Sequence, residues 1–370
     1  MHLTANDSRL AFWSHVREFA VPASMIESAT ARRLAGDWSA ACAAARVDVD
    51  LNLRAVSRVH GSHVASTIRA DLRHLAPDLL RWHFPRISPD GLLRPGLTVS
   101  LARYGELHLV ARTPPAWASA GQRISLALLD SPRPDRRFRL DQHRHLWDAR
   151  RASELRERSC GDPPERWQGE AALLGGADRP VVVRLGHRRR IVLNPDAPGK
   201  PFQLPDASIW VPPDVELLRA GLIDADRLHP LVASALLGTS AVARSPGTPR
   251  DSRLVQCRGS THRIGVVDGV LVPLDHSPDE IRREELLVAL GGNGVPCLQA
   301  IDAAHRHPAS LVDVRARLDH GDTAGALAVV EDLLGPDALL RDGELRDELE
   351  TAARRKVLHG LYRAGLAAFC

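Results

Sequence analysis

The chain has 370 residues, of which 44% are hydrophobic and 25% charged, and these proportions are typical of a soluble globular protein. Its length exceeds the roughly 250–300 residues at which a single hydrophobic core stops growing, so two or three domains are expected. No apolar run approaches the roughly 18 residues of a membrane span, and the segment from Met1 to Ala20 lacks the pattern of a signal peptide, so a cytoplasmic protein without a membrane contact is expected.

The basic side chains are almost all arginine and are unevenly placed. Only Lys200 and Lys356 are lysine. The abundance of Arg, Ala, Gly, Pro and Leu is typical of a GC-rich bacterial genome, which explains much of the preference for arginine. Residues 1–160 carry 24 basic and 16 acidic residues, whereas residues 271–370 carry 11 and 17. This split indicates either an anionic partner for the front half or two ends of the chain that face each other.

The five cysteines are odd in number, far apart and never in a C-x-x-C pair. This usage is typical of a reducing cytoplasm without a disulfide framework. The cysteines are Cys42, Cys160, Cys257, Cys297 and Cys370.

The first part of the chain is predicted to be helical and the next part to form a β-meander. Leu10, Trp13 and Val16 recur on one helix face. After Pro85 the period changes to two, with alternating apolar residues from Leu97 to Leu128, which predicts antiparallel strands with one buried face. A charged helix is expected from about residue 142 to 158.

The rest of the chain is predicted to contain two further strand segments and a helical end. Val181–Leu185 and Arg190–Leu193 have the pattern of a hairpin. Asp268-Gly269 suits a type I′ turn, and Ser277-Pro278-Asp279-Glu280 has the pattern of a capping box that opens a helix. The last 75 residues have helical periodicity, with Asp322 as a helix cap.

These patterns predict an α+β fold with helical ends that flank small antiparallel β-meanders. The expected regions are a helical region over 1–87, a meander with a charged helix over 88–160, a hairpin with short helices over 178–237, and a meander followed by helices over 252–370. Each meander enters a helix through Leu-Asp, so an internal duplication stays open, as do the oligomeric state and the relative placement of the regions.

No complete catalytic or metal-binding motif is found, so neither a cofactor nor a metal is expected. His60 and His63 have i, i+3 spacing but lack a third ligand. The pairs His143/His145 and His305/His307 have i, i+2 spacing, which points two rings apart on a helix. Asp275-His276 resembles half of an acid–base pair, but neighbouring side chains on a strand point to opposite faces. Gly291-Gly292-Asn293-Gly294 follows a helix and lacks the order of a phosphate loop.

The arginine-rich stretch from residue 133 to 158 and the hairpin tip at 188–190 are the best candidates for an anion or nucleic-acid surface. Possible i, i+3 and i, i+4 pairs (Asp148/Arg151 and Glu154/Arg158) indicate that part of this charge is neutralised internally. The candidate residues are Arg136, Arg137, Arg139, Arg144, Arg150, Arg151, Arg188, Arg189 and Arg190.

Three functional hypotheses follow. The first is a non-enzymatic interaction or regulatory protein that recognises another protein through its basic front half and acidic carboxy-terminal region. The second is a nucleic-acid-binding protein that uses the arginine clusters. The third is an enzyme whose site is assembled only in three dimensions, from residues far apart in the sequence.

Overall fold

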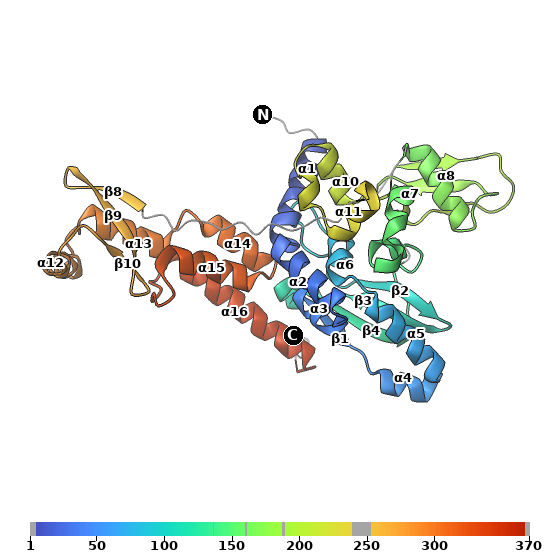
Figure 1. Ribbon diagram of the computed structural model, residues 1–370, viewed down its shortest axis with the longest axis horizontal. Coiled ribbons are helices and arrows are strands. Elements are labelled where there is room, and N and C mark those ends of the chain that lie inside the picture. The colour runs from blue at the N-terminus through green and yellow to red at the C-terminus, as the bar shows by residue number, and fades with distance from the viewer. Residues whose placement is uncertain (1–4, 136, 160, 187–188, 239–252, 367–370) are drawn as a thin grey trace. The chain divides into compact units, whose positions relative to one another are not determined.

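A computed structural model describes residues 5–135, 137–159, 161–186, 189–238 and 253–366. The chain divides into two compact units, Met1–Arg244 and Ser245–Cys370. The predicted α+β class is confirmed, because helices alternate with small, mostly antiparallel sheets (Figure 1). The regions expected at 1–87, 88–160 and 178–237 lie in the first unit, and the region expected at 252–370 lies in the second. Among the described residues, no helix combines the length and hydropathy that a membrane crossing requires.

The N-terminal unit is built on a four-stranded sheet with the strand order β1-β4-β3-β2. The alternating pattern predicted from Leu97 to Leu128 forms β2 (Thr98–Tyr104), β3 (Leu107–Arg112) and β4 (Ile124–Asp130), which pair antiparallel. Strand β1 (Val47–Asp50) pairs parallel to β4. The first 85 residues are therefore not entirely helical, because the alternation in Val-Asp-Val-Asp places a strand between helices.

Short helices surround this sheet and contribute more side chains to the unit's main hydrophobic cluster than its four strands do. They are α1 (Ala5–His15), α2 (Ala23–Leu34), α3 (Trp38–Ala44), α4 (Leu53–His60), α5 (Ser62–Arg73), α6 (Pro77–His83), α7 (Leu155–Ser159), α10 (Pro213–Arg219) and α11 (Pro230–Leu237). Trp82 and Trp147 are almost fully buried and join the helices to the sheet in one hydrophobic cluster. Burial of such large aromatic side chains is a major source of stability.

The prediction of a charged helix from residue 142 to 158 is wrong for most of this segment. The chain instead forms 3₁₀ turns over Arg144–Leu146 and Ala149–Glu154, and only α7 is α-helical. A β-bridge between Leu75 and Asp148 interrupts the segment, and the Asp148 carboxylate accepts a hydrogen bond from the backbone N–H of Arg150. Tertiary contacts of Asp148 thus override the local helical tendency.

A second small sheet with two helices completes the N-terminal unit. The predicted hairpin is confirmed as β5 (Val181–Arg184) and β6 (Arg190–Leu193), and β7 (Phe202–Gln203) adds parallel to β5. Helix α8 (Pro163–Leu173) and helix α9 (Asp206–Ile209) flank this sheet.

Buried histidines make the stability of the N-terminal unit depend on pH. The His83 ring is buried, and its Nδ1 lies 3.0 Å from the carbonyl oxygen of Leu146. Burial lowers the pKa of His83 to about 4, against the partial compensation of that carbonyl, and the nearby His229 lowers it further. Burial also lowers the pKa of His145, and Arg158 adds to this effect.

We expect the free energy of unfolding to fall as the pH is lowered from 6.5 to 4. Above pH 6.5 His83 is neutral in both states and has no effect, but below it the unfolded chain binds a proton that the folded chain does not. Over the range from pH 6.5 to pH 4, this difference in proton binding lowers the free energy of unfolding by about 3 kcal/mol in total. Urea unfolding of His83→Gln against wild type, at a series of pH values, should show a shallower slope for the variant in this window. Equal dependence of the unfolding free energy on pH in the two proteins would contradict this role of His83.

The C-terminal unit begins with a three-stranded antiparallel sheet of the order β10-β9-β8. Its strands are β8 (Arg253–Cys257), β9 (Ser260–Val267) and β10 (Val270–Pro273). The predicted type I′ turn is confirmed, since Val267 pairs with Val270 and both Asp268 (φ 48°) and Gly269 (φ 77°) have positive φ.

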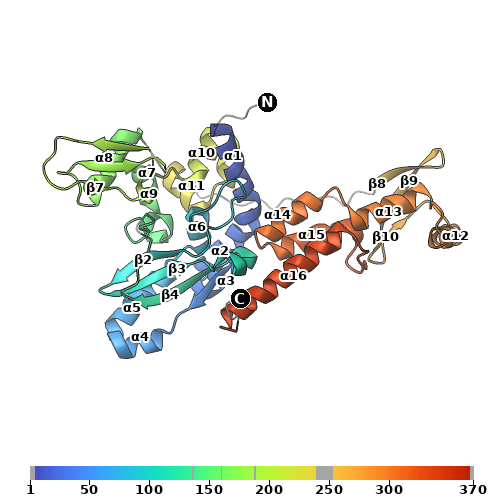
Figure 2. The same cartoon turned by 180° about the vertical axis from the view of Figure 1, so that it is seen from behind.

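Helices follow this sheet, as the sequence predicts for the last part of the chain. They are α12 (Pro278–Ala289), α13 (Pro296–Arg306), α14 (Leu311–Asp319), α15 (Thr323–Leu334) and α16 (Glu344–Arg363). The predicted caps are confirmed, because Ser277 accepts a hydrogen bond from the N–H of Glu280 and Asp322 accepts one from that of Gly325. Helices α14, α15 and α16 lie side by side (Figure 2). Helix α13 packs against all three strands of the sheet, and their shared core includes Cys257, Ile264 and Cys297.

Candidate metal centre

Four side chains that can bind a metal ion meet in the C-terminal unit. Cys257 ends β8, His262 lies on β9, His276 precedes α12, and Cys297 lies in the first turn of α13. One ligand atom from each residue lies within 4.8 Å of the other three. Within the described residues, no other group of three or more Cys, His, Asp or Glu side chains meets this condition.

The register of the first hairpin places two of these ligands on one face. Val255 pairs with His262, and Cys257 pairs with Ser260. Because side chains alternate between the faces of a strand, Val255 and Cys257 point to the same side, and His262 points there too. Helix α13 packs on this sheet and brings Cys297 to the cluster, so the packing of a helix on the sheet positions the ligands.

The separations between ligand atoms suit a tetrahedral ion. His262 Nδ1 lies 2.8 Å from His276 Nε2, Cys257 Sγ lies 3.5 Å from His276 Nε2, and Cys297 Sγ lies 3.9 Å from His262 Nδ1. Bonds of about 2.0–2.1 Å to nitrogen and about 2.3 Å to sulfur at a tetrahedral zinc ion would separate the ligand atoms by about 3.3–3.8 Å. These three separations therefore lie within about 0.5 Å of the range expected at a tetrahedral zinc ion.

Glu280 orients His276 toward the cluster. Its Oε2 lies 3.2 Å from His276 Nδ1, and its Oε1 accepts a hydrogen bond of 2.9 Å from Arg258 Nη1. An imidazole that donates through Nδ1 to a carboxylate presents the lone pair of Nε2, which is the atom that faces Cys257 and His262. The capping box places Glu280 in the first turn of α12, so a local helix-start signal also supplies the residue behind a ligand.

Both sulfur atoms belong to fully buried side chains. Cys257 and Cys297 each have 0% exposure. Burial raises the pKa of Cys297 to about 11, and the neighbouring thiol of Cys257 contributes to this rise. A Cys297 thiolate is therefore unfavourable here without a cation, and a divalent cation would stabilise it directly.

Asp275 and His276 do not form the acid–base pair considered from the sequence. Asp275 accepts hydrogen bonds from the backbone N–H of Arg263 (2.7 Å) and from its Nη2 (2.8 Å). These bonds hold the pKa of Asp275 at about 2. His276 instead faces the two cysteines, as expected for neighbours on an extended segment.

The other histidine pairs have different partners. His60 Nε2 lies 3.3 Å from Asp130 Oδ1, whereas His143 bonds to the Arg139 carbonyl oxygen through Nδ1 (2.7 Å) and to the Ser208 hydroxyl through Nε2 (2.8 Å). Gly291 follows α12 with φ 87°, so the glycine-rich segment begins as a helix end.

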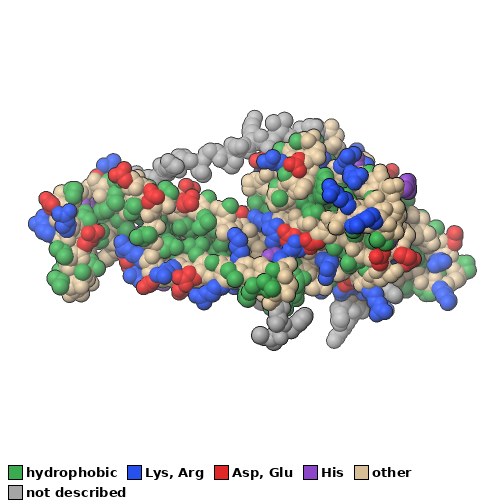
Figure 3. All heavy atoms as spheres, turned by 90° about the horizontal axis from the view of Figure 1, so that it is seen from below, with side chains coloured by type: hydrophobic (Ala, Val, Ile, Leu, Met, Phe, Trp, Pro, Cys, Tyr) green, Lys and Arg blue, Asp and Glu red, His purple; other side chains and the backbone are tan. Residues whose placement is uncertain are grey.

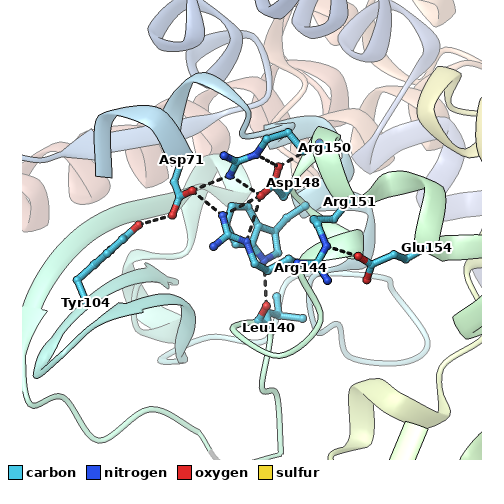
Figure 4. Close-up of polar contacts among 9 residues, drawn as sticks. Asp71, Tyr104, Leu140, Arg144, Asp148, Arg150, Arg151 and Glu154 are labelled. Atoms are coloured by element: carbon cyan, nitrogen blue, oxygen red, sulfur yellow. Dashed lines mark hydrogen bonds and ion pairs between the residues drawn. The ribbon is translucent and has the colours of Figure 1, made fainter. Parts of the chain in front are cut away.

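Two of the candidate arginines form a network with buried carboxylates (Figure 4). Arg144 Nη2 lies 2.7 Å from Asp71 and from Asp148, and Arg150 Nη2 lies 2.6 Å from Asp71 and 2.7 Å from Asp148. The Tyr104 hydroxyl donates to Asp71. Burial acts to raise the pKa of both carboxyl groups, but the hydrogen bonds from the arginines outweigh it and lower the pKa values.

Most of the other candidates are also paired. Arg137 binds Asp135, Arg139 binds Asp141, and Arg151 binds Glu154. Of the two ion pairs expected at helical spacing, the pair of Glu154 with Arg158 is present, with 3.5 Å between Glu154 Oε2 and Arg158 Nη1. The other is not, because Asp148 binds Arg144 and Arg150 in place of Arg151. Arg189 and Arg190 are exposed, and Arg136 and Arg188 lie outside the described residues. Basic and acidic side chains lie next to each other over much of the face in Figure 3.

Sequence reasoning missed the metal centre because its spacing matches no common motif. The order is Cys, four residues, His, thirteen residues, His, twenty residues and Cys. The elements predicted from the sequence did contain a signal. Cys257 and His276 lie on either side of the predicted hairpin around Asp268-Gly269, and Cys297 follows the proline that begins the helix after α12.

Comparisons of the chain with protein-family models, with curated proteins and with solved structures find no match.

Proposed function

We propose that the protein is a non-enzymatic interaction protein whose C-terminal unit folds around one structural zinc ion. The observation that carries the zinc assignment is the meeting of two fully buried thiols and two imidazoles within 4.8 Å. Nitrogen and sulfur donors in a tetrahedral arrangement favour Zn²⁺ over the hard cations Mg²⁺ and Ca²⁺, which prefer oxygen. A cytoplasmic location, which the cysteine usage predicts, would keep both thiols reduced.

The donor set favours a structural role for the ion. Catalytic zinc sites have three protein ligands and keep a fourth position for water or substrate, whereas structural sites have four protein ligands. Cys257, His262, His276 and Cys297 would fill all four positions. The ion would then join the first hairpin, the start of α12 and the start of α13.

The proposed recognition role rests on the surface of the same unit. The chain from residue 271 to 370 carries six more acidic than basic residues. The end of α12 exposes Leu286, Leu287, Val288 and Leu290. Exposed apolar side chains beside acidic ones are typical of a protein interface, and charge complementarity favours a partner with a basic surface. The nucleic-acid alternative has less support, because most described arginines of the candidate stretch are paired with carboxylates.

Zinc content tests the metal assignment. We expect about one equivalent of zinc per chain in protein purified without added chelator, measured by elemental analysis, and less than a tenth of that in Cys297→Ser. Cobalt substitution should give the intense visible absorption of a tetrahedral site with thiolate ligands. Cys42→Ala is the matched control, since Cys42 is equally buried but lies in the N-terminal unit.

Two outcomes would contradict the proposal. One is wild-type protein that binds neither zinc nor cobalt. The other is a Cys297→Ser variant that retains the wild-type zinc content, because the ion would then be held elsewhere.

A further inference from the structure

A hollow in the N-terminal unit gathers three guanidinium groups. Its volume is about 810 Å³, and it is lined by side chains of Arg103 at the end of β2, Arg133 after β4, Arg139, and Phe202 and Gln203 of β7. Gln142 and three prolines complete its wall. This volume lies within the roughly 300–1,000 Å³ that is typical of small-molecule sites.

The arginines are only partly neutralised. Arg103 Nε and Arg139 Nη2 each lie 2.9 Å from the same oxygen of Asp141, and Arg139 Nε lies 2.9 Å from the other oxygen. Asp141 is nearly buried, whereas Arg103 is 46% exposed, so the carboxylate lies behind the guanidinium groups. One carboxylate thus holds two arginines in place, and the exposed Arg133 adds a third positive charge.

The donors that Asp141 leaves unused are suited to an anion. A guanidinium group has five N–H donors in a rigid plane, and the bonds to Asp141 occupy two nitrogens of Arg139 and one of Arg103. The remaining N–H groups and those of Arg133 can bind several oxygens of one phosphate group. Arginine is well suited to such multidentate phosphate contacts.

Phe202 adds an aromatic side chain to the lining of the hollow. The Phe202 ring packs directly over Gly176, where a β-carbon would lie 2.6 Å from it, so this glycine allows the ring its position. An aromatic surface at the wall of the hollow matches a nucleobase, which has a π-face.

We infer that this hollow binds a mononucleotide, with its phosphate on Arg103, Arg133 and Arg139 and its base against Phe202. The site is separate from the metal centre and would make the N-terminal unit a ligand-binding module. Binding here requires no chemical step, so the site would act as a sensor or as a point of recognition.

Calorimetric titration with the four ribonucleoside monophosphates tests this inference, and ribose 5-phosphate serves as the probe without a base. We expect at least one mononucleotide to bind with Kd below about 1 mM and about tenfold more tightly than ribose 5-phosphate. Arg133→Ala should weaken this binding about tenfold, because it removes a charged donor from an exposed position. Arg190→Ala is the matched control, since Arg190 is exposed on β6 but does not line the hollow.

A second variant separates the base from the phosphate. Phe202→Leu should weaken the mononucleotide several-fold and leave ribose 5-phosphate unchanged, since stacking on an aromatic ring involves only the base. The inference is overturned if no mononucleotide binds, if Arg133→Ala and Arg190→Ala have the same effect, or if a single-stranded oligonucleotide binds far more tightly with a steep salt dependence. The last outcome would assign the arginines to nucleic acid.

Discussion

Removing the zinc ion should unfold much of the C-terminal unit and leave the N-terminal unit folded. Structural zinc sites in small domains contribute about 10–16 kcal/mol of apparent binding free energy, which exceeds the stability of most domains. The ion would hold together the sheet and α13, whose shared core consists of few large side chains. Without it, the two thiols and two imidazoles would be held only by contacts among themselves and with Glu280.

Hydrogen exchange measured with and without a strong chelator checks this expectation. Amide protection should be lost in β8, β9 and α13 and retained in β3 and β4. His276→Ala should give the same pattern without chelator, and His60→Ala, a histidine of the N-terminal unit, should not. Equal protection of β9 in the two conditions would show that the fold does not depend on the ion.

Replacing Asp148 by alanine should be strongly destabilising for the N-terminal unit. The Asp148 side chain is fully buried and binds Arg144 and Arg150 through both carboxylate oxygens. Removal of one partner from a buried ion pair costs about 3–5 kcal/mol, because it leaves uncompensated charge. Arg144 also lies over the Trp147 ring, with 4.8 Å between its Cζ and the ring centroid, so its displacement would disturb the hydrophobic cluster.

Urea unfolding of Asp148→Ala and Glu154→Ala provides the comparison. Glu154 binds the exposed Arg151, and such a surface pair contributes about 0–1 kcal/mol. Its contact of 3.5 Å with the nearly buried Arg158 is the longer of that arginine's two ion pairs, since Glu170 lies 2.6 Å from it. The two variants remove a carboxylate from the same segment but differ in burial. A loss below about 1 kcal/mol for Asp148→Ala would mean that Asp71 alone compensates both arginines.

Local signals predicted much of the fold. The Asp268-Gly269 turn and the Ser277 helix cap depend on a few neighbouring residues, and both are confirmed. The Glu280 side chain, the other half of the predicted capping box, binds His276 and Arg258. The helix prediction for 142–158 is wrong because Arg144 and Arg150 bind Asp71 and because Asp148 forms a bridge with Leu75. Asp71 and Leu75 are far from this segment in the sequence. A pattern of charges at helical spacing does not reveal such contacts.

The candidate sites were harder to predict than the elements that carry them. The arginines were recognised from their number, but their pairing with Asp71 or Asp141 depends on tertiary structure. The four metal ligands were each visible in the sequence, yet their convergence depends on the pairing of β8 with β9 and on the packing of α13. Spacing alone carries no information on a contact that a helix makes with a sheet.

The attachment of α12 has a consequence for communication within the C-terminal unit. None of its residues is buried, and it is held by the bonds of Glu280 to His276 and of Arg258 to Glu280 and Glu284. An element fixed by so few polar bonds would become loose as soon as His276 left its position. Occupancy of the cation site would thereby control whether the leucines at the end of α12 are presented in a fixed geometry, so that metal supply in the cell could switch recognition on or off.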